Sequence, residues 1–289
     1  MALDVDHLRT WIGRSEAIED AVTKVPVAAL SATLDRDDPR PRDGDPLPPL
    51  WHWLYFLPLH RQSELGPDGH AKRGGFLPPV PLPRRMWAGG RFEFHRPLRV
   101  GEAIRRTSTI ADVSHKEGRT GPLIFVLVRH EIAGEDGLAL IEEHDIVYRE
   151  ASAPNEAAAT PRPAPAQAAW RRDIVPDDVL LFRYSALTFN GHRIHYDRRY
   201  VTEVEGYPGL IVHGPLIATL LVDLLRRNVP APLTRFSFRA IHPLFDIAPF
   251  AVCGEPEASG RSAKVWAQDA EGFLAMQADA EFAAMDIRP

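Results

Sequence analysis

The chain has 289 residues, of which 45% are hydrophobic and 25% are charged, so it can build one large or two ordinary globular domains. Its net charge of −5 and pI of about 6.2 indicate no basic face, and nucleic acid is therefore not an expected partner. No apolar run approaches the ~20 residues that span a membrane, and the single cysteine, Cys253, excludes internal disulfides. We expect a cytoplasmic protein, since reduced cysteine is usual there.

The N-terminal stretch has its apolar residues at helical spacing from Asp6 to about Leu34, and this pattern predicts a helix. Proline, with 27 residues in the chain, then clusters at 39–49 and again at 77–83. Such clusters favour extended chain over helix or strand interiors.

A third segment, 151–168, is rich in alanine and proline and has almost no large apolar side chain. A segment of this composition buries no core and tends to be extended. We therefore predict an interdomain linker at 151–168. It separates an N-terminal domain (1–150, the first half) from a C-terminal domain (169–289, the second half), both of ordinary size.

The two halves carry similar patterns in the same order. An Arg-Phe-x-Phe strand that leads to Pro-Leu occurs at 91–98 and again at 235–244. Each half also contains a predicted β-hairpin, with strands at 124–132 and 138–150 around a GEDG turn and at 263–268 and 273–282 around a DAEG turn. Agreement of several elements in sequence order indicates an internal duplication.

The clearest helix in the sequence runs from Pro215 to about Arg227. Proline suits the first helical turn, and leucine and isoleucine recur so as to give the helix a wide apolar face. Two arginines at its end, Arg226 and Arg227, are favourable for the helix dipole. One long apolar helix followed by antiparallel strands predicts an α+β fold in which a sheet wraps around a helix.

The densest chemistry lies in 182–222, which includes the start of this helix. Asn190, His192, Arg193, His195, Tyr196 and Asp197 fall within eight residues, and Gly209, His213 and Gly214 follow at the helix entrance. A short loop of this composition can bring imidazole, amide and carboxylate groups to one pocket. The free N–H groups and the positive dipole end of the following helix would point at a ligand.

This segment resembles the hydratase-2 motif of MaoC-like enzymes, a double hot-dog family. His195-Tyr-Asp197 matches its His-x-Asp element, and Ile211-Val-His-Gly214 matches its helix entrance. The fuller string FRYSALTFNGHRIHYD, with GFLPPVPLPRRMWAGGRFEF and KEGRTGPLIFV in the first half, is most similar to the type 2 hydroxyacyl-thioester dehydratases and the related mesaconyl-C4-CoA (3-methylfumaryl-CoA) hydratases. The resemblance covers nearly the whole chain. It implies two tandem hot-dog units, each an antiparallel sheet around a central helix.

The chain departs from the broader family at one position. Five residues before His195, where that family has a catalytic aspartate, stands Asn190, and the usual asparagine position holds His192. Because asparagine cannot exchange a proton, we assign proton transfer chiefly to His195, whose imidazole can activate water at neutral pH. Asn190 would orient the water or the substrate. The Gly214 N–H would stabilise the thioester oxyanion.

The other motif residues are expected to bind the substrate. We expect His192 to hydrogen-bond, Arg193 to meet a carboxylate or phosphate of the substrate, and Asp197 to fix a tautomer or close a salt bridge. Gly209 and His213 belong to the same substrate-binding helix entrance. Zinc ligation by His192, His195 and Asp197 is disfavoured because no second ligand pair lies nearby in the sequence, so no metal is expected.

The activity that the resemblance implies is reversible addition of water to a 2-enoyl-CoA, most specifically conversion of mesaconyl-C4-CoA to citramalyl-CoA. Coenzyme A enters as part of this acyl-CoA thioester substrate, and no cofactor is expected. The first half lacks the motif, so we expect it to be non-catalytic and to shape the acyl pocket. A homodimer or a higher homo-oligomer is the expected assembly.

Several alternatives stay open. Itaconyl-CoA hydration and 3-hydroxyacyl-thioester dehydration belong to the same class of reaction. A hot-dog thioesterase would instead hydrolyse the thioester and release free thiol. A non-catalytic acyl-thioester binding module would leave the thioester unchanged, and Asn190 at the acid position is the best argument for it.

Overall fold

A computed structural model describes residues 3–72, 74–118, 121–150 and 160–284. Half of the predicted linker, at 151–159, lies outside these described residues. Within them, no helix has the length and apolar character needed to cross a membrane.

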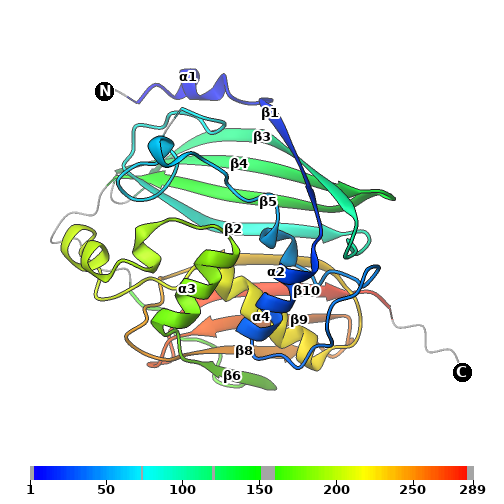
Figure 1. The fold of residues 1–289 in the computed structure, drawn as a ribbon. Coiled ribbons are helices and arrows are strands. Elements are labelled where there is room, and N and C mark those ends of the chain that lie inside the picture. Colours follow the sequence, from blue (N-terminus) through cyan, green and yellow to red (C-terminus); the bar gives the residue numbers. More distant parts are fainter. Residues whose placement is uncertain (1–2, 73, 119–120, 151–159, 285–289) are drawn as a thin grey trace, which may run out of the picture.

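All ten described strands belong to one antiparallel sheet, shown in Figure 1, in the order β1-β3-β4-β5-β2-β7-β10-β9-β8-β6. The first five are β1 (Ser15–Ala21), β2 (Arg84–Phe94), β3 (Ala103–Gly118), β4 (Gly121–Gly134) and β5 (Gly137–Arg149). The second five are β6 (Trp170–Ile174), β7 (Leu233–Ala240), β8 (Phe250–Pro256), β9 (Ser262–Gln268) and β10 (Leu274–Phe282). The predicted strands and hairpins are therefore present in both halves.

The strand order confirms the duplication. Read inwards from each edge, the first half gives β1-β3-β4-β5-β2 and the second gives β6-β8-β9-β10-β7, so corresponding strands occupy corresponding places. The halves meet at the β2–β7 pair, where Phe92 lies opposite Phe236 and Gly90 opposite Phe238. This is the expected α+β, double hot-dog architecture, with two equivalent five-stranded units in one sheet.

The helices lie on one face of the sheet. They are α1 (Val5–Arg9), α2 (Lys24–Thr33), α3 (Asp178–Leu187) and α4 (Gly214–Asn228), with short helices at Trp51–Leu54, Gln62–Glu64, Arg193–His195 and Tyr200–Val204. Figure 1 shows α2, α3 and α4 together over the second-half strands. The predicted helix at Pro215–Arg227 is α4, and its residues from Leu216 to Leu225 are all buried.

The prediction of one helix from Asp6 to Leu34 is wrong. The stretch forms α1, then strand β1, and then α2. Strand β1 pairs along its whole length with β3, from Ser15 opposite Thr109 to Ala21 opposite Ala103. The 16-residue β3 would otherwise expose a long row of unpaired backbone groups, and pairing with β1 overrides local helical spacing.

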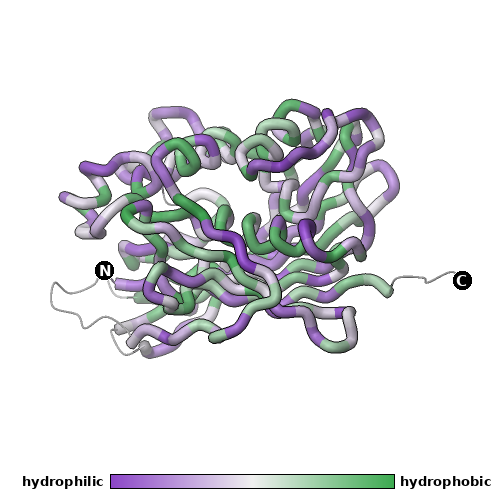
Figure 2. The backbone as a smooth tube through the Cα atoms, turned by 90° about the horizontal axis from the view of Figure 1, so that it is seen from below, coloured by the Kyte–Doolittle hydropathy of each residue, from purple (hydrophilic) through white to green (hydrophobic). Residues whose placement is uncertain are grey.

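One apolar core joins the two halves beneath the helices. It includes Phe92 of β2, Phe236 of β7 and Leu216 of α4, and it continues into α2 through Leu30. Figure 2 shows the sheet as one layer and the helices with their connecting loops as the other, with hydrophobic stretches in both layers. Helix α4 is thereby fixed against the sheet, and its N-terminus is held in a constant place.

Candidate active site

The motif segment folds into tight turns between α3 and α4. Helix α3 ends at Leu187, and Phe189 then adopts the left-handed conformation (φ 50°), which turns the chain toward Asn190. A short 3-10 helix at Arg193–His195 follows. The chain returns before α4, where the Ile211 N–H donates to the Ile194 carbonyl at 3.0 Å. These turns bring His195 beside the entrance of α4.

His195 has one ring nitrogen in a hydrogen bond and one without a partner among the described residues. Its Nδ1 lies 2.7 Å from the Ile211 carbonyl oxygen. Because a carbonyl only accepts, Nδ1 carries the hydrogen and Nε2 keeps its lone pair. The side chain is 7% exposed, and burial lowers the pKa of His195 to about 4 despite the hydrogen bond to Ile211. At neutral pH it is therefore an uncharged base.

The imidazole of His213 stacks on that of His195, with centroids 3.7 Å apart and planes 18° from parallel. His213 is completely buried, and its Nε2 lies 2.8 Å from Ser185 Oγ. Its Nδ1 is buried and has no hydrogen-bond partner among the described residues. Burial, together with the charges of His195 and His192, holds the pKa of His213 well below its usual value. His213 is thus an uncharged ring that packs against one face of the His195 ring.

Gly214 begins α4, directly after His213. Its N–H belongs to the first helical turn, where backbone donors have no partner inside the helix. A Cβ placed on Gly214 would meet nothing within 4 Å. Open space therefore adjoins the positive end of this helix, directly after His213, whose ring stacks on that of His195.

Asn190 and His192 are joined by a short hydrogen bond. The His192 N–H donates to Asn190 Oδ1 at 3.0 Å, which leaves the Asn190 amide N–H groups as donors for a ligand. The His192 ring lies edge-on to His195, with centroids 5.4 Å apart. Burial and the neighbouring charges of His70 and His195 lower the pKa of His192 to about 2. His192 is consequently a neutral neighbour of the catalytic candidate.

Arg193 and Asp197 form a salt bridge with each other. Arg193 Nη2 lies 2.7 Å from Asp197 Oδ2, its Nη1 donates to the Pro67 carbonyl at 2.9 Å, and its guanidinium lies over the Tyr200 ring. Arg193 is therefore not free to meet a substrate carboxylate without losing these partners. Asp197 is turned toward Arg193 instead of toward the imidazoles.

Gly209 has a packing reason to be glycine. A Cβ there would lie 2.5 Å from Asp246 Oδ1, which accepts the Leu210 N–H at 2.8 Å. The close approach of Asp246 fixes the loop that enters α4. Substrate binding by Gly209 remains a prediction.

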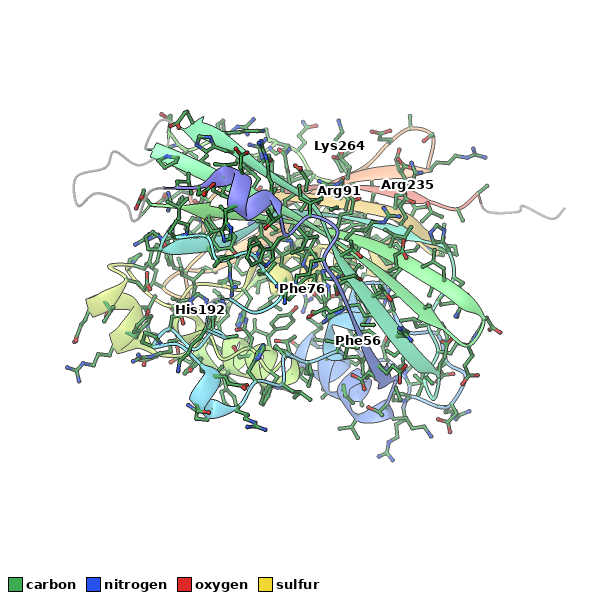
Figure 3. The ribbon with its side chains drawn as sticks, turned by 90° about the horizontal axis from the view of Figure 1, so that it is seen from above. Phe56, Phe76, Arg91, His192, Arg235 and Lys264 are labelled. Atoms are coloured by element: carbon green, nitrogen blue, oxygen red, sulfur yellow. The ribbon has the colours of Figure 1, made fainter. Side chains whose placement is uncertain are left out.

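A loop of the first half lies against the motif segment, and sequence reasoning missed it. Its Asp68 carbonyl accepts the Arg193 N–H at 2.9 Å, and its His70 ring lies 3.9 Å from the His192 ring. In Figure 3, His192 lies beside this light-blue part of the first half, on the opposite side of the sheet from Arg91. Ligand atoms of Asp68, His70 and His192 lie within 4.8 Å of one another. The zinc ligands considered from the sequence were instead His192, His195 and Asp197, and only His192 is common to both sets.

A second polar cluster lies on the inner face of the first-half strands. Glu142 of β5 is 2% exposed and bonds to His52 Nε2 and Trp53 Nε1, each at 2.8 Å, and also to His144. Burial alone would raise the pKa of Glu142, but His144 and His52 outweigh it and hold the pKa well below its usual value. A charged carboxylate is thus kept within the core.

Arg106 of β3 faces this cluster. Its Nε is buried and has no hydrogen-bond partner among the described residues, and its guanidinium lies 5.2 Å from the centroid of Phe56. Burial lowers the pKa of Arg106, while the charge of Glu142 opposes that effect. Since buried guanidinium donors normally have partners, this one is available to an anionic or carbonyl group.

Comparison with known proteins shows which enzyme family the chain belongs to. Residues 50–246 match the family described as hydroxyacyl-thioester dehydratase type 2. Mesaconyl-C(4)-CoA hydratase of Chloroflexus aurantiacus is 50% identical over 271 residues, which cover 94% of this chain and 96% of that protein. The mitochondrial type 2 hydroxyacyl-thioester dehydratase of Schizosaccharomyces pombe is 27% identical over 82% of this chain and 88% of its own.

The chain belongs to the hydroxyacyl-thioester dehydratase type 2 family and is a hydro-lyase of the MaoC-like kind. Solved structures agree on the fold. A MaoC-like dehydratase superposes with a TM-score of 0.71 at 13% identity, covering 95% of this chain and 99% of that one. HtdX of Mycobacterium tuberculosis superposes with a TM-score of 0.65 at 18% identity, covering 93% and 100%.

Proposed function

We propose that this protein hydrates mesaconyl-C4-CoA reversibly to citramalyl-CoA. The observation that carries the proposal is the pairing of a neutral His195, with Nε2 free, and the open helix N-terminus at Gly214. The 50% identity with the Chloroflexus aurantiacus hydratase supports the choice of substrate. Coenzyme A enters with the substrate, and acid–base chemistry suffices for the reaction without a redox group.

The proposed chemistry follows from the needs of an enoyl thioester. His195 Nε2 takes a proton from water while the water oxygen attacks the β-carbon. Negative charge then develops on the thioester oxygen, where the Gly214 N–H and the positive end of α4 stabilise it. An amide N–H of Asn190 holds the water or the substrate in line. His213 keeps the His195 ring in place by stacking against it.

The free carboxylate of mesaconyl-C4-CoA requires a cation. Arg193 was the candidate from sequence, but Asp197, the Pro67 carbonyl and the Tyr200 ring already engage it. Arg106 suits the role better because its buried Nε has no hydrogen-bond partner within the described part of the chain. The cluster and the motif segment also meet the same apolar core, since Tyr184 belongs to that core and Trp53, which donates to Glu142, packs against it.

A panel of thioesters tests the proposal. Purified protein is incubated with mesaconyl-C4-CoA, itaconyl-CoA, crotonyl-CoA and a 3-hydroxyacyl-CoA, and both enoyl absorbance and free thiol are followed. We expect the fastest loss of enoyl absorbance with mesaconyl-C4-CoA and no thiol release. Preference for itaconyl-CoA or the 3-hydroxyacyl-CoA would reassign the substrate. Thiol release would indicate a thioesterase, and tight binding without turnover would indicate a binding module.

The Arg106→Met variant tests the carboxylate partner separately. Methionine keeps much of the aliphatic volume but removes the charge, so we expect kcat/KM for mesaconyl-C4-CoA to fall at least about tenfold, as for loss of a charge-assisted hydrogen bond. Crotonyl-CoA, which has no second carboxylate, should be hydrated as by the wild type. An equal loss on both substrates would remove Arg106 from this role.

A further inference from the structure

The proposed hydration needs two proton transfers, one from the attacking water and one to the α-carbon of the thioester. His195 provides the first, but Asn190, at the acid position of the broader family, has no proton to exchange. The inference that follows rests on the proposed function. A second group that can carry a proton has to reach the same thioester.

Most titratable side chains near His195 in the described ranges are enclosed or occupied. His213 is completely buried, and Tyr184 is 2% exposed. Asp197 is ion-paired with Arg193. None of these three side chains can reach a substrate carbon unless it first leaves its buried position or its ion pair.

His192 is also a poor proton donor. Its backbone N–H is held by Asn190, and its ring lies between those of His70 and His195. Burial, with the charges of His70 and His195, lowers the pKa of His192 to about 2. It carries no extra proton at neutral pH.

His70 is the remaining imidazole at the site. Its Nδ1 lies 3.1 Å from Asp68 Oδ2, and its side chain is 30% exposed, so a ligand and solvent protons can reach it. A carboxylate only accepts, which places the Nδ1 hydrogen toward Asp68 and leaves Nε2 as the second protonation site. We propose that His70 is the second catalytic acid–base residue, supplied by the first half, and that Asp68 positions it.

The backbone around His70 is built to hold this position. Gly69 has a φ of +88°, and a Cβ on it would lie only 1.8 Å from the Gly191 carbonyl oxygen. The Asp68 carbonyl and the Pro67 carbonyl both accept hydrogen bonds from Arg193, at 2.9 Å each. The backbone of the loop therefore meets both the backbone and the Arg193 side chain of the motif segment, which fixes His70 against His192.

His195 Nε2 accepts a proton from water as the C–O bond forms at the β-carbon. The C=C electron pair shifts to the bond between the α-carbon and the thioester carbon, and the carbonyl π pair moves onto the thioester oxygen beside Gly214, which gives the enolate. The enolate then takes a proton from protonated His70 Nε2, which forms the C–H bond at the α-carbon. Solvent removes the proton from His195 and returns one to His70. In dehydration, His70 instead removes the α-proton.

The test compares His70→Ala and Asp68→Asn with the control His60→Ala, which removes an exposed histidine from the preceding segment. The substrate is whichever thioester of the panel the wild type hydrates. For His70→Ala we expect kcat to fall at least ~100-fold and KM to change little, as on removal of a general acid or base. Added imidazole should restore part of the lost rate, because the vacated site is open to solvent. Asp68→Asn should show a smaller loss and the control none.

A second readout follows the α-proton of the hydrated product in deuterated water. The wild type and His60→Ala should exchange it, and His70→Ala should not. His70→Asn keeps a planar polar side chain and replaces the alanine variant if that one does not fold. Normal exchange, or a kcat within about threefold of wild type, would overturn the proposal.

Two further outcomes are decisive. Loss of wild-type activity on dialysis against EDTA, with recovery on adding Zn²⁺, would overturn the proposal by making Asp68, His70 and His192 a metal site. Failure of mesaconyl-C4-CoA alone among the panel would overturn only the substrate assignment. A wild type that hydrates none of the thioesters would overturn both proposals.

Discussion

The rings of His195 and His213 are stacked, with centroids 3.7 Å apart, and His213 is anchored from behind by Ser185. The stack, together with the bond from His195 Nδ1 to the Ile211 carbonyl, leaves the His195 ring one orientation. Nε2 of His195 is consequently the only ring nitrogen of this pair that is neither bonded nor enclosed among the described residues.

Replacing His195 by alanine should lower kcat at least ~100-fold, because the base that activates water is lost. The fold should persist, since the variant removes a group at the edge of the core and leaves α4 in place. Steady-state hydration kinetics and a thermal melt measure the two effects. His60→Ala serves as the control, and an activity of His195→Ala near that control would exclude the residue as the base.

Replacing Ser185 by alanine should loosen the stack. It leaves His213 Nε2 unpaired inside the protein, which costs about 1–3 kcal/mol of unfolding free energy. The turnover number should fall as the His195 ring gains freedom. Urea unfolding and kcat are compared with those of Ser237→Ala, the same change at a half-buried position on β7. Equal stability of the two variants would show that the Ser185 bond contributes nothing.

Replacing Asn190 by aspartate keeps an oxygen acceptor for the His192 N–H but removes the amide donors. We expect kcat to fall on the order of tenfold, as when one oriented donor is lost, and not to rise toward an Asp/His mechanism. The new charge should also raise the pKa of nearby imidazoles, so that activity is lost at a higher pH on the acid side. A pH profile of kcat/KM measures both effects. A faster variant would show that this site accepts a carboxylate as its acid.

Stability should fall on acidification below neutral pH. His195 has a folded-state pKa of about 4, and the pKa values of the buried His130 and His213 are also lowered, whereas an unfolded histidine has a pKa of about 6.5. Between pH ~6.5 and ~4 these histidines therefore bind protons in the unfolded chain but stay neutral in the folded chain. Each such group removes up to about 1.4 kcal/mol of unfolding free energy per pH unit as the pH falls.

Urea midpoints measured across this window test the prediction. The variant His195→Gln should show a shallower dependence on pH, since one titrating group has been removed. An unchanged slope would mean that His195 is not buried in the neutral form.

The contact between the two halves is tested at Gly69. Gly69→Ala and Gly74→Ala both place a Cβ at positive φ, but only the first also meets an obstacle, the Gly191 carbonyl oxygen at 1.8 Å. Backbone strain should lower the free energy of unfolding of both variants by a similar amount, about 1–2 kcal/mol. Gly69→Ala alone should displace the His70 loop and lower kcat, by at least about tenfold. Equal kinetics in the two variants would show that this contact does not matter for turnover.

The sequence predicted those parts of the fold whose signal is local. The apolar face of α4, the alternation along β10 and the hairpin of β4 and β5 each carry their own periodicity, so these elements were found near their observed bounds. Strand β1 was missed because it forms by pairing with the edge of β3, and the paired residues lie between 82 (Ala21 and Ala103) and 94 (Ser15 and Thr109) positions apart in the sequence. No periodicity within Ser15–Ala21 could indicate that partner.

The residues of the site also divide into those that a local sequence pattern indicates and those that only the packing of distant segments brings together. Asn190, His192 and His195 were found together because they are close in sequence. Asp68 and His70 were not, since they reach His192 only through the packing of the two halves. The sequence places Asp68 and His70 on either side of Gly69, near further glycines. This pattern does not indicate a site by itself, because only the close approach of Gly69 to Gly191 brings the loop to the motif segment.

The central claim, that His195 drives addition of water to mesaconyl-C4-CoA, is tested most directly by hydration in H₂¹⁸O. Wild-type protein and the His195→Ala variant are incubated with the thioester, and the products are analysed by mass spectrometry. We predict citramalyl-CoA with one ¹⁸O at its new hydroxyl from the wild type, and essentially unchanged substrate from the variant. Labelled free acid with released CoA, or equal labelling by both proteins, would contradict the claim.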